Sequence, residues 1–80
     1  MRVTKQRIEA AKQQITIDVV RYLCSKHNIS TEAALRMFIA TKTYALLQID
    51  SARLWIETHE YVINMLECEF NNDVEGWLSI

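Results

Sequence analysis

The sequence predicts a small all-α fold: three main helices and a short irregular or helical connector around residues 49–57, forming a small helical bundle and a single domain over residues 1–80. The chain has one Gly and no Pro, so few residues force a helix to break. Apolar residues recur every three or four positions over long segments. Half of the residues are apolar, which indicates a folded core rather than a disordered chain.

The first helix is predicted over residues 3–26, where no turn-forming residue interrupts the pattern. The β-branched stretch "ITIDV" at residues 15–19 is also compatible with a short strand. The helix is favoured because good helix formers at residues 9–14 lead directly into this stretch. Residues that recur at spacings of three and four indicate that this helix is amphipathic: Ile8, Ala11, Ile15, Val19, Tyr22 and Lys26.

A second helix is predicted over residues 31–47. In "KHNIS", Asn28 tolerates the left-handed conformation that ends a helix, and Ser30 can cap the N-terminus of the next one. Apolar residues occupy much of the circumference of this helix, which is typical of a helix packed on two sides. The expected stripe contains Ala34, Leu35, Phe38, Lys42, Ala45 and Leu46, and is widened by Met37, Thr41 and Tyr44.

The third helix is predicted over residues 59–71, after the connector. Asp50 and Ser51 can turn the chain through their side-chain oxygens, and Thr58 is a candidate N-cap. We expect Trp55 to anchor the connector by burying its ring, with a partner for the indole N–H. The core between the second and third helices is expected to contain Leu35, Phe38, Val62, Met65 and Leu66.

Charge is distributed unevenly along the chain. Residues 1–26 hold six cations and two acids, a net charge of +4, whereas the remaining residues hold three cations and eight acids, a net charge of −5. The two ends should attract each other, within one subunit or between subunits. The acids at Glu67 and Glu69, near the end of the third helix, should find a basic partner on the first helix. A basic arm for nucleic acid is the alternative interpretation.

No pattern in the sequence fixes a catalytic chemistry. A Gly-rich phosphate loop and a nucleophile motif are both missing, so we expect no enzyme activity and no cofactor. Cys24 and Cys68 are far apart and are expected to be reduced thiols. Together with His27 and His59 they do not have the spacing of a known zinc module, so no metal site is expected. With no apolar run of roughly 18–20 residues and no signal peptide, we expect a cytoplasmic protein without a membrane segment.

A helix-turn-helix over residues 23–45 is the main alternative function, since a short turn precedes a new helix there. Its second helix would offer only Arg36 and Lys42 for phosphate contacts, which is few for a DNA-binding protein. A ribbon-type DNA binder would instead pair the stretch at residues 15–19 as a strand in a dimer.

Two stretches, "STEAALRMFIATKTYALL" and "DSARLWIETHEYVINMLECEF", carry a resemblance to a family. Together they are similar to a group of small, uncharacterised bacterial all-helical proteins associated with toxin–antitoxin and mobile-element neighbourhoods. The resemblance covers roughly residues 30–70 and implies an antitoxin-like or regulatory protein without assigned catalytic residues. Its recurring features are packing residues: Thr43, Tyr44, Leu54, Trp55, Tyr61 and Met65.

The expected function is therefore a non-catalytic protein-interaction module that binds a protein partner. A homodimer is also expected, because 80 residues bury only roughly 60–65% of their unfolded surface and leave apolar side chains to cover. The expected interface combines basic residues of the first helix with aromatic and apolar residues further along: Arg7, Lys12, Tyr44, Trp55, Trp77, Leu78 and Ile80.

Overall fold

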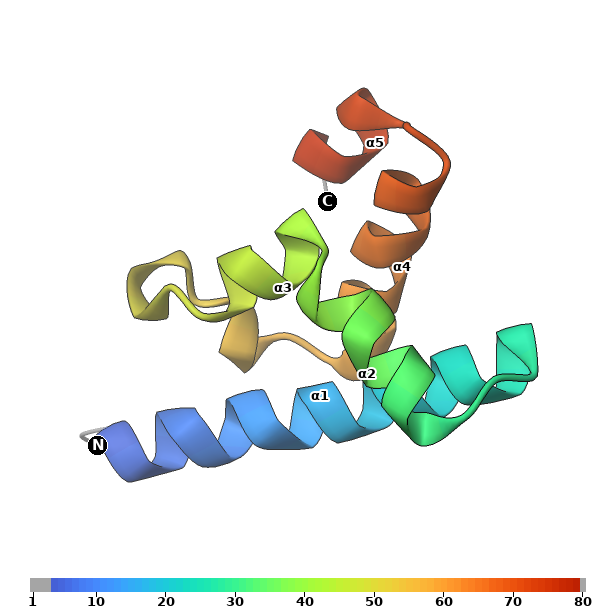
Figure 1. Ribbon diagram of the computed structural model, residues 1–80. Coiled ribbons are helices and arrows are strands. Elements are labelled where there is room, and N and C mark those ends of the chain that lie inside the picture. Colours follow the sequence, from blue (N-terminus) through green and yellow to red (C-terminus); the bar gives the residue numbers. More distant parts are fainter. Residues whose placement is uncertain (1–3, 80) are drawn as a thin grey trace.

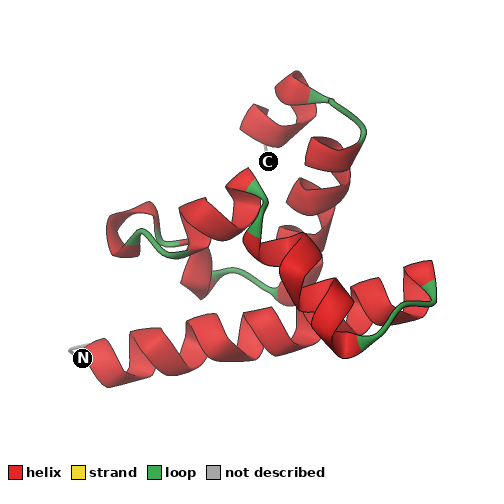
Figure 2. Cartoon of the chain, viewed as in Figure 1, coloured by secondary structure: helices red, strands yellow, loops and turns green. Residues whose placement is uncertain are grey.

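The computed structural model describes residues 4–79, and these form an all-α fold without strands, as predicted (Figures 1 and 2). Residues 15–19 are helical rather than extended. Within the described residues, no helix combines the length and apolar character needed to cross a membrane. The elements are α1 (Lys5–His27), α2 (Thr31–Ile39), α3 (Lys42–Leu47), the 3₁₀ turns η1 (Asp50–Ala52) and η2 (Leu54–Ile56), α4 (His59–Phe70) and α5 (Val74–Ser79).

The long helix α1 runs along one side of the molecule, and α2, η2 and α4 pack against it (Figure 1). The short helix α3 packs on α2 and α4, whereas α5 packs on α4 and lies away from α1 (Figure 1). The chain therefore has one face dominated by α1 and an opposite end dominated by α5.

Hydroxyl side chains begin four of the helices. The Oγ atoms of Thr4, Ser30, Thr41 and Thr58 each accept a hydrogen bond from the backbone N–H three residues later. Asn28 ends α1 in the left-handed conformation, with φ 53°. The predicted helix caps at Asn28, Ser30 and Thr58 are confirmed. These helix ends could be predicted from the sequence because capping depends on neighbouring residues.

The single helix predicted over residues 31–47 is wrong, because the chain breaks between α2 and α3. The Thr41 hydroxyl donates to the Phe38 carbonyl at 2.6 Å and accepts from the Tyr44 N–H at 3.1 Å. A threonine side chain that bonds the backbone in this way competes with a continuous helix. The Glu69 carboxylate also accepts the backbone N–H groups of Lys42 and Thr43, at 2.7 and 2.9 Å.

The connector consists of two 3₁₀ turns joined at Arg53, which has φ 58°. The indole N–H of Trp55 donates to the Asp50 carbonyl at 2.9 Å, so the expected partner is present. The ring is only half-buried, and the deeply buried residue of this segment is Leu54, at 4% exposure. Leu54 therefore anchors the connector in the core, while Trp55 closes its turn.

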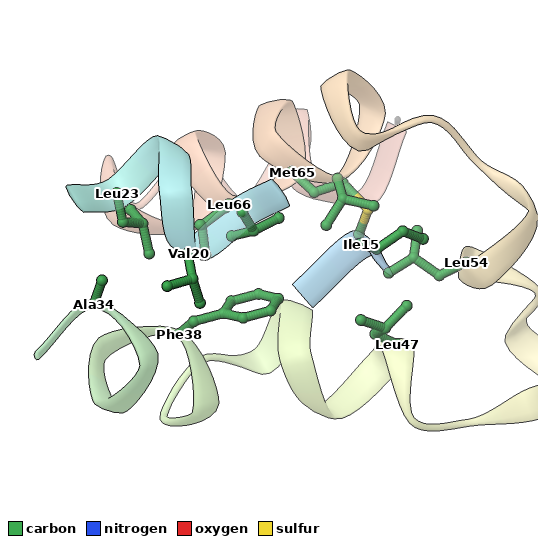
Figure 3. Close-up of a cluster of buried hydrophobic side chains, with 11 residues drawn as sticks. Ile15, Val20, Leu23, Ala34, Phe38, Leu47, Leu54, Met65 and Leu66 are labelled. Carbon is green, nitrogen blue, oxygen red and sulfur yellow. The ribbon is translucent and has the colours of Figure 1, made fainter. Parts of the chain in front are cut away.

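The core is formed by side chains from α1, α2, α3, η2 and α4. The Phe38 ring points into the cluster (Figure 3). Four of the five predicted core residues are buried, but Leu35 is 40% exposed, and that part of the prediction is wrong. Ala34 and Phe38 form the buried face of α2, and Leu35 lies beside that face, partly in solvent. The buried apolar residues are Ile15, Val19, Val20, Leu23, Ala34, Phe38, Leu47, Leu54, Val62, Met65 and Leu66.

The C-terminal residues form the helix α5, which was not predicted from the sequence. The Asp73 carboxylate accepts the Gly76 N–H at 2.9 Å at the start of α5. Trp77 is half-buried, and its indole N–H donates to the Thr43 hydroxyl at 2.9 Å. By contrast, Leu78 is 69% exposed.

Candidate functional site

An open apolar groove lies between α1 and α2, with a volume of about 630 Å³. Two large apolar side chains on its walls stay partly in solvent: Ile17 is 45% exposed and Leu35 is 40% exposed. Such side chains at a concave surface are typical of sites that bind another apolar surface. The groove is lined by Thr16, Ile17, Val20, Arg21, Cys24 and Ser25 of α1 and by Thr31 and Leu35 at the start of α2.

The groove exists because α1 carries two different faces. Ile15, Val19 and Leu23 point into the core, whereas Ile17 and Cys24 lie about a third of a turn or more away, on the outer side. The turn at residues 28–30 reverses the chain, so that the first turns of α2 lie beside the end of α1 (Figure 1). Val20, at 7% exposure, forms the buried floor between them.

The lining of the groove also contains polar groups. The Cys24 thiol is 3.9 Å from the Thr31 hydroxyl oxygen. Arg21 is exposed, and within residues 4–79 its guanidinium has no ion-pair partner. The groove therefore combines an apolar floor with an exposed positive charge at Arg21.

A second apolar surface surrounds α5. Val74 and Leu78 lie one helical turn apart and are 65% and 69% exposed. Trp77 and Leu78 line two shallow cavities of about 420 and 410 Å³ on either side of the helix. This α5 surface, defined by Val74, Trp77 and Leu78, is at the opposite end of the molecule from α1 (Figure 1).

A buried hydrogen-bond network holds α5 in position. Thr43, which is fully buried, donates its hydroxyl hydrogen to Glu69 Oε1 at 2.8 Å and accepts the indole N–H of Trp77. Glu69 thus caps α3 and, through Thr43, connects α3, α4 and α5. The prediction that Glu69 has a basic partner on the first helix is wrong, because its carboxylate accepts backbone N–H groups at the start of α3 instead.

Glu67 has the predicted partner on the first helix. Its carboxylate accepts from Lys26 Nζ at 2.5 Å and from the Tyr22 hydroxyl at 2.7 Å. The Lys26 ammonium lowers the pKa of Glu67, and Glu67 in turn raises the pKa of Lys26. This attraction between the basic and acidic ends is made within one chain.

The predicted interface residues do not form one surface. Lys12 is 5% exposed: its ammonium binds the Asp50 carboxylate, and also the Gln48 carbonyl at 3.1 Å, so the prediction of Lys12 as an interface residue is corrected. Arg7 is exposed on α1. Tyr44 is half-buried against the Phe38 ring, with centroids 5.1 Å apart.

The remaining predicted interface residues fall into separate places. Trp55 lies beside Lys12, because both side chains bind Asp50. The indole N–H of Trp55 donates to the Asp50 backbone carbonyl, and the Lys12 ammonium binds the Asp50 carboxylate. Trp77 and Leu78 share the α5 surface. Ile80 lies outside the described residues.

Ile17 and Leu35 were not among the binding residues predicted from the sequence. Ile17 was available as a signal, because it lies off the buried stripe of the first helix. Leu35 could not be separated from the core residues, since it is adjacent to Ala34 and three residues from Phe38, which are both buried. Cys24 and Cys68 are free thiols, as expected, and within residues 4–79 no group of three or more His, Cys, Asp or Glu could hold a metal ion.

No model of a known family, no curated protein and no solved structure matches the chain.

Proposed function

We propose that this chain is a non-catalytic protein-interaction module that binds a protein partner through the groove between α1 and α2. The observation that carries the proposal is the exposure of Ile17 and Leu35 on facing walls of that groove. A partner that covers these side chains would remove apolar surface from water. Such burial is the main favourable contribution to the free energy of protein association. The resemblance over residues 30–70 supports an antitoxin-like or regulatory role in the cytoplasm of a bacterium.

The proposal includes a homodimer, and the α5 surface supports it. Val74 and Leu78 would meet their own copies across a two-fold axis, which repeats each contact twice. Charge pairing between the chain ends is not needed for this dimer, because Lys26 and Glu67 already pair within one chain.

DNA binding through residues 23–45 draws less support. On α2, Arg36 pairs with Glu32 at 2.7 Å, so one of the two cations expected to contact phosphates is beside an acid. Phosphate contacts make DNA affinity fall steeply with salt. A steep salt-dependent affinity for duplex DNA would favour this alternative over the interaction module.

Groove variants test the proposal directly. Tagged wild-type chain, Leu35→Arg and the control Ile49→Arg should each be purified from the native cell. Ile49 is a matched control because it is 51% exposed and lines none of the cavities described above. A partner retained by wild type and Ile49→Arg but lost from Leu35→Arg supports the proposal. A partner retained equally by all three chains contradicts the groove as the binding site.

A further inference from the structure

The outer side of α1 carries a second stripe that differs from its buried one. It consists of uncharged residues at alternating spacings of four and three, from residue 6 to residue 24: Gln6, Ala10, Gln13, Ile17, Val20 and Cys24. This 3.5-residue spacing keeps one face of a helix turned toward a second helix lying along it. The stripe spans about 27 Å, since each helical residue rises about 1.5 Å.

Two cavities lie end to end along this stripe. Lys5, Gln6, Glu9, Ala10 and Gln13 line a shallow one of about 400 Å³ near the start of α1. The groove with α2 continues it toward the end of α1. The stripe and the two cavities together define the outer face of α1. Most of its residues are exposed, whereas Thr16 and Cys24 are half-buried and Val20 is buried.

The charges beside the outer face are mainly positive. Arg7 and Arg21 flank the same edge and are two heptads apart, and Lys5 lies at the N-terminal end. Glu9 is the acid among the lining residues, and it lies 3.4 Å from the Lys12 ammonium. A partner helix with acids beside its apolar stripe would therefore complement this face.

A second copy of the chain does not supply such a helix. The acidic helix α4 uses its apolar stripe in the core, where Val62, Met65 and Leu66 are buried. The acidic helix α5 has six residues, about 9 Å, and is too short for the face. Pairing α1 with an antiparallel α1 would place Arg7 near Arg21 of the other copy, where like charges repel.

We propose that the outer face of α1, with the adjoining edge of α2, docks one amphipathic helix of a different protein whose apolar stripe is flanked by acids. This proposal rests on the proposed function and specifies the partner. Ile17 and Leu35 supply the apolar contact, while the positive charge of Arg21 favours a partner helix with acidic residues beside its apolar stripe.

Designed peptides test the proposal in the full-length protein. Two helical peptides of three heptads, with Leu at every a and d position, differ only in carrying Glu or Lys at the flanking positions. Fluorescence anisotropy measures the affinity of each for wild type, Arg21→Glu, Ile17→Arg and Ile49→Arg. Circular dichroism checks that every variant remains folded.

We expect wild type to prefer the Glu peptide. Arg21→Glu should weaken that peptide by about three- to tenfold and strengthen the Lys peptide, because exposed ion pairs contribute modestly. Ile17→Arg should weaken the Glu peptide by about tenfold or more, and Ile49→Arg should not change it.

Three results would overturn the inference. The first is equal binding of both peptides, or of neither, by wild type. The second is unchanged Glu-peptide affinity in Ile17→Arg. The third is a homodimer in sedimentation velocity that Ile17→Arg disrupts, since a second copy would then occupy the face. With any of these three results, a partner that is lost from Leu35→Arg in the native purification would still support the proposed function. Failure of the proposed acidic helical partner is therefore distinguishable from failure of the groove as a binding site.

Discussion

Replacing Thr43 by Val tests whether the hydroxyl of this residue holds the C-terminal half of the fold together. Thr43 is fully buried, and its hydroxyl bonds Glu69 at 2.8 Å and Trp77 at 2.9 Å. Valine has nearly the same shape, so the packing around residue 43 should survive while both hydrogen bonds are lost. Any loss of stability then reports mainly on the hydroxyl.

The two hydrogen bonds set the expected magnitude. A bond to a charged group contributes about 1.5–3 kcal/mol and a neutral one about 0.5–1.5 kcal/mol. Glu69 keeps its two backbone N–H partners, and both Glu69 and Trp77 are only half-buried, so water can replace part of what is lost. We expect Thr43→Val to lower the free energy of unfolding by about 2 kcal/mol, toward the lower end of the combined range. For a chain of this length the melting temperature should fall by about 8–16 °C.

Urea unfolding followed by circular dichroism measures this change, and Thr43→Ser is the matched control. Serine keeps the hydroxyl and loses one methyl group, which costs about 0.8 kcal/mol. In a Trp55→Phe background, the fluorescence of Trp77 should shift to longer wavelength in Thr43→Val but not in Thr43→Ser. A Thr43→Val variant as stable as Thr43→Ser, with unchanged Trp77 fluorescence, would refute the reasoning.

Three further perturbations test other parts of the structure. Phe38→Ala should lower the free energy of unfolding in urea by about 2–5 kcal/mol, because the ring is fully buried. Glu67→Gln should destabilise the protein at neutral pH and much less at acid pH: the Lys26 ammonium lowers the pKa of Glu67, so this stabilisation is present above the usual carboxyl pKa and lost as pH falls through the lowered value. Lys12→Met should free the connector, and trypsin should cleave faster after Arg53.

Each of these perturbations has an outcome that contradicts it. An unchanged urea midpoint for Phe38→Ala would remove that ring from the centre of the core. If wild type and Glu67→Gln differ equally in stability at every pH between about 3 and 7, the carboxylate is not the stabilising group. Equal rates of tryptic cleavage after Arg53 in wild type and Lys12→Met would show that the buried ammonium does not restrain the connector.

Much of the local structure was predictable because it depends on neighbouring residues. The end of α1 at Asn28 and the starts at Ser30 and Thr58 follow from side chains that bond backbone groups a few positions away. The helical state of residues 15–19 follows from the helix formers that precede them. The attraction of Glu67 to the basic first helix was also foreseeable from charge.

The break between α2 and α3 and the helix α5 depended on contacts across the fold. Thr41 could have remained inside a helix, but Glu69, 27 residues beyond Lys42, accepts the N–H groups at the start of α3. That contact cannot be inferred from local spacing, because the chain must first bring α4 beside α3. Trp77 similarly finds its partner 34 residues away in Thr43.

The sequence by itself determined the all-α class, most helix ends and four of the five expected core residues, since periodicity and capping are local properties. The tertiary structure alone decided which apolar residues remain outside. Leu35 stays partly exposed. Lys12 is buried, and its ammonium binds Gln48 and Asp50 at the connector instead of remaining a surface charge. Exposure depends on what the rest of the chain covers, and for a thin core that depends on the packing of every helix.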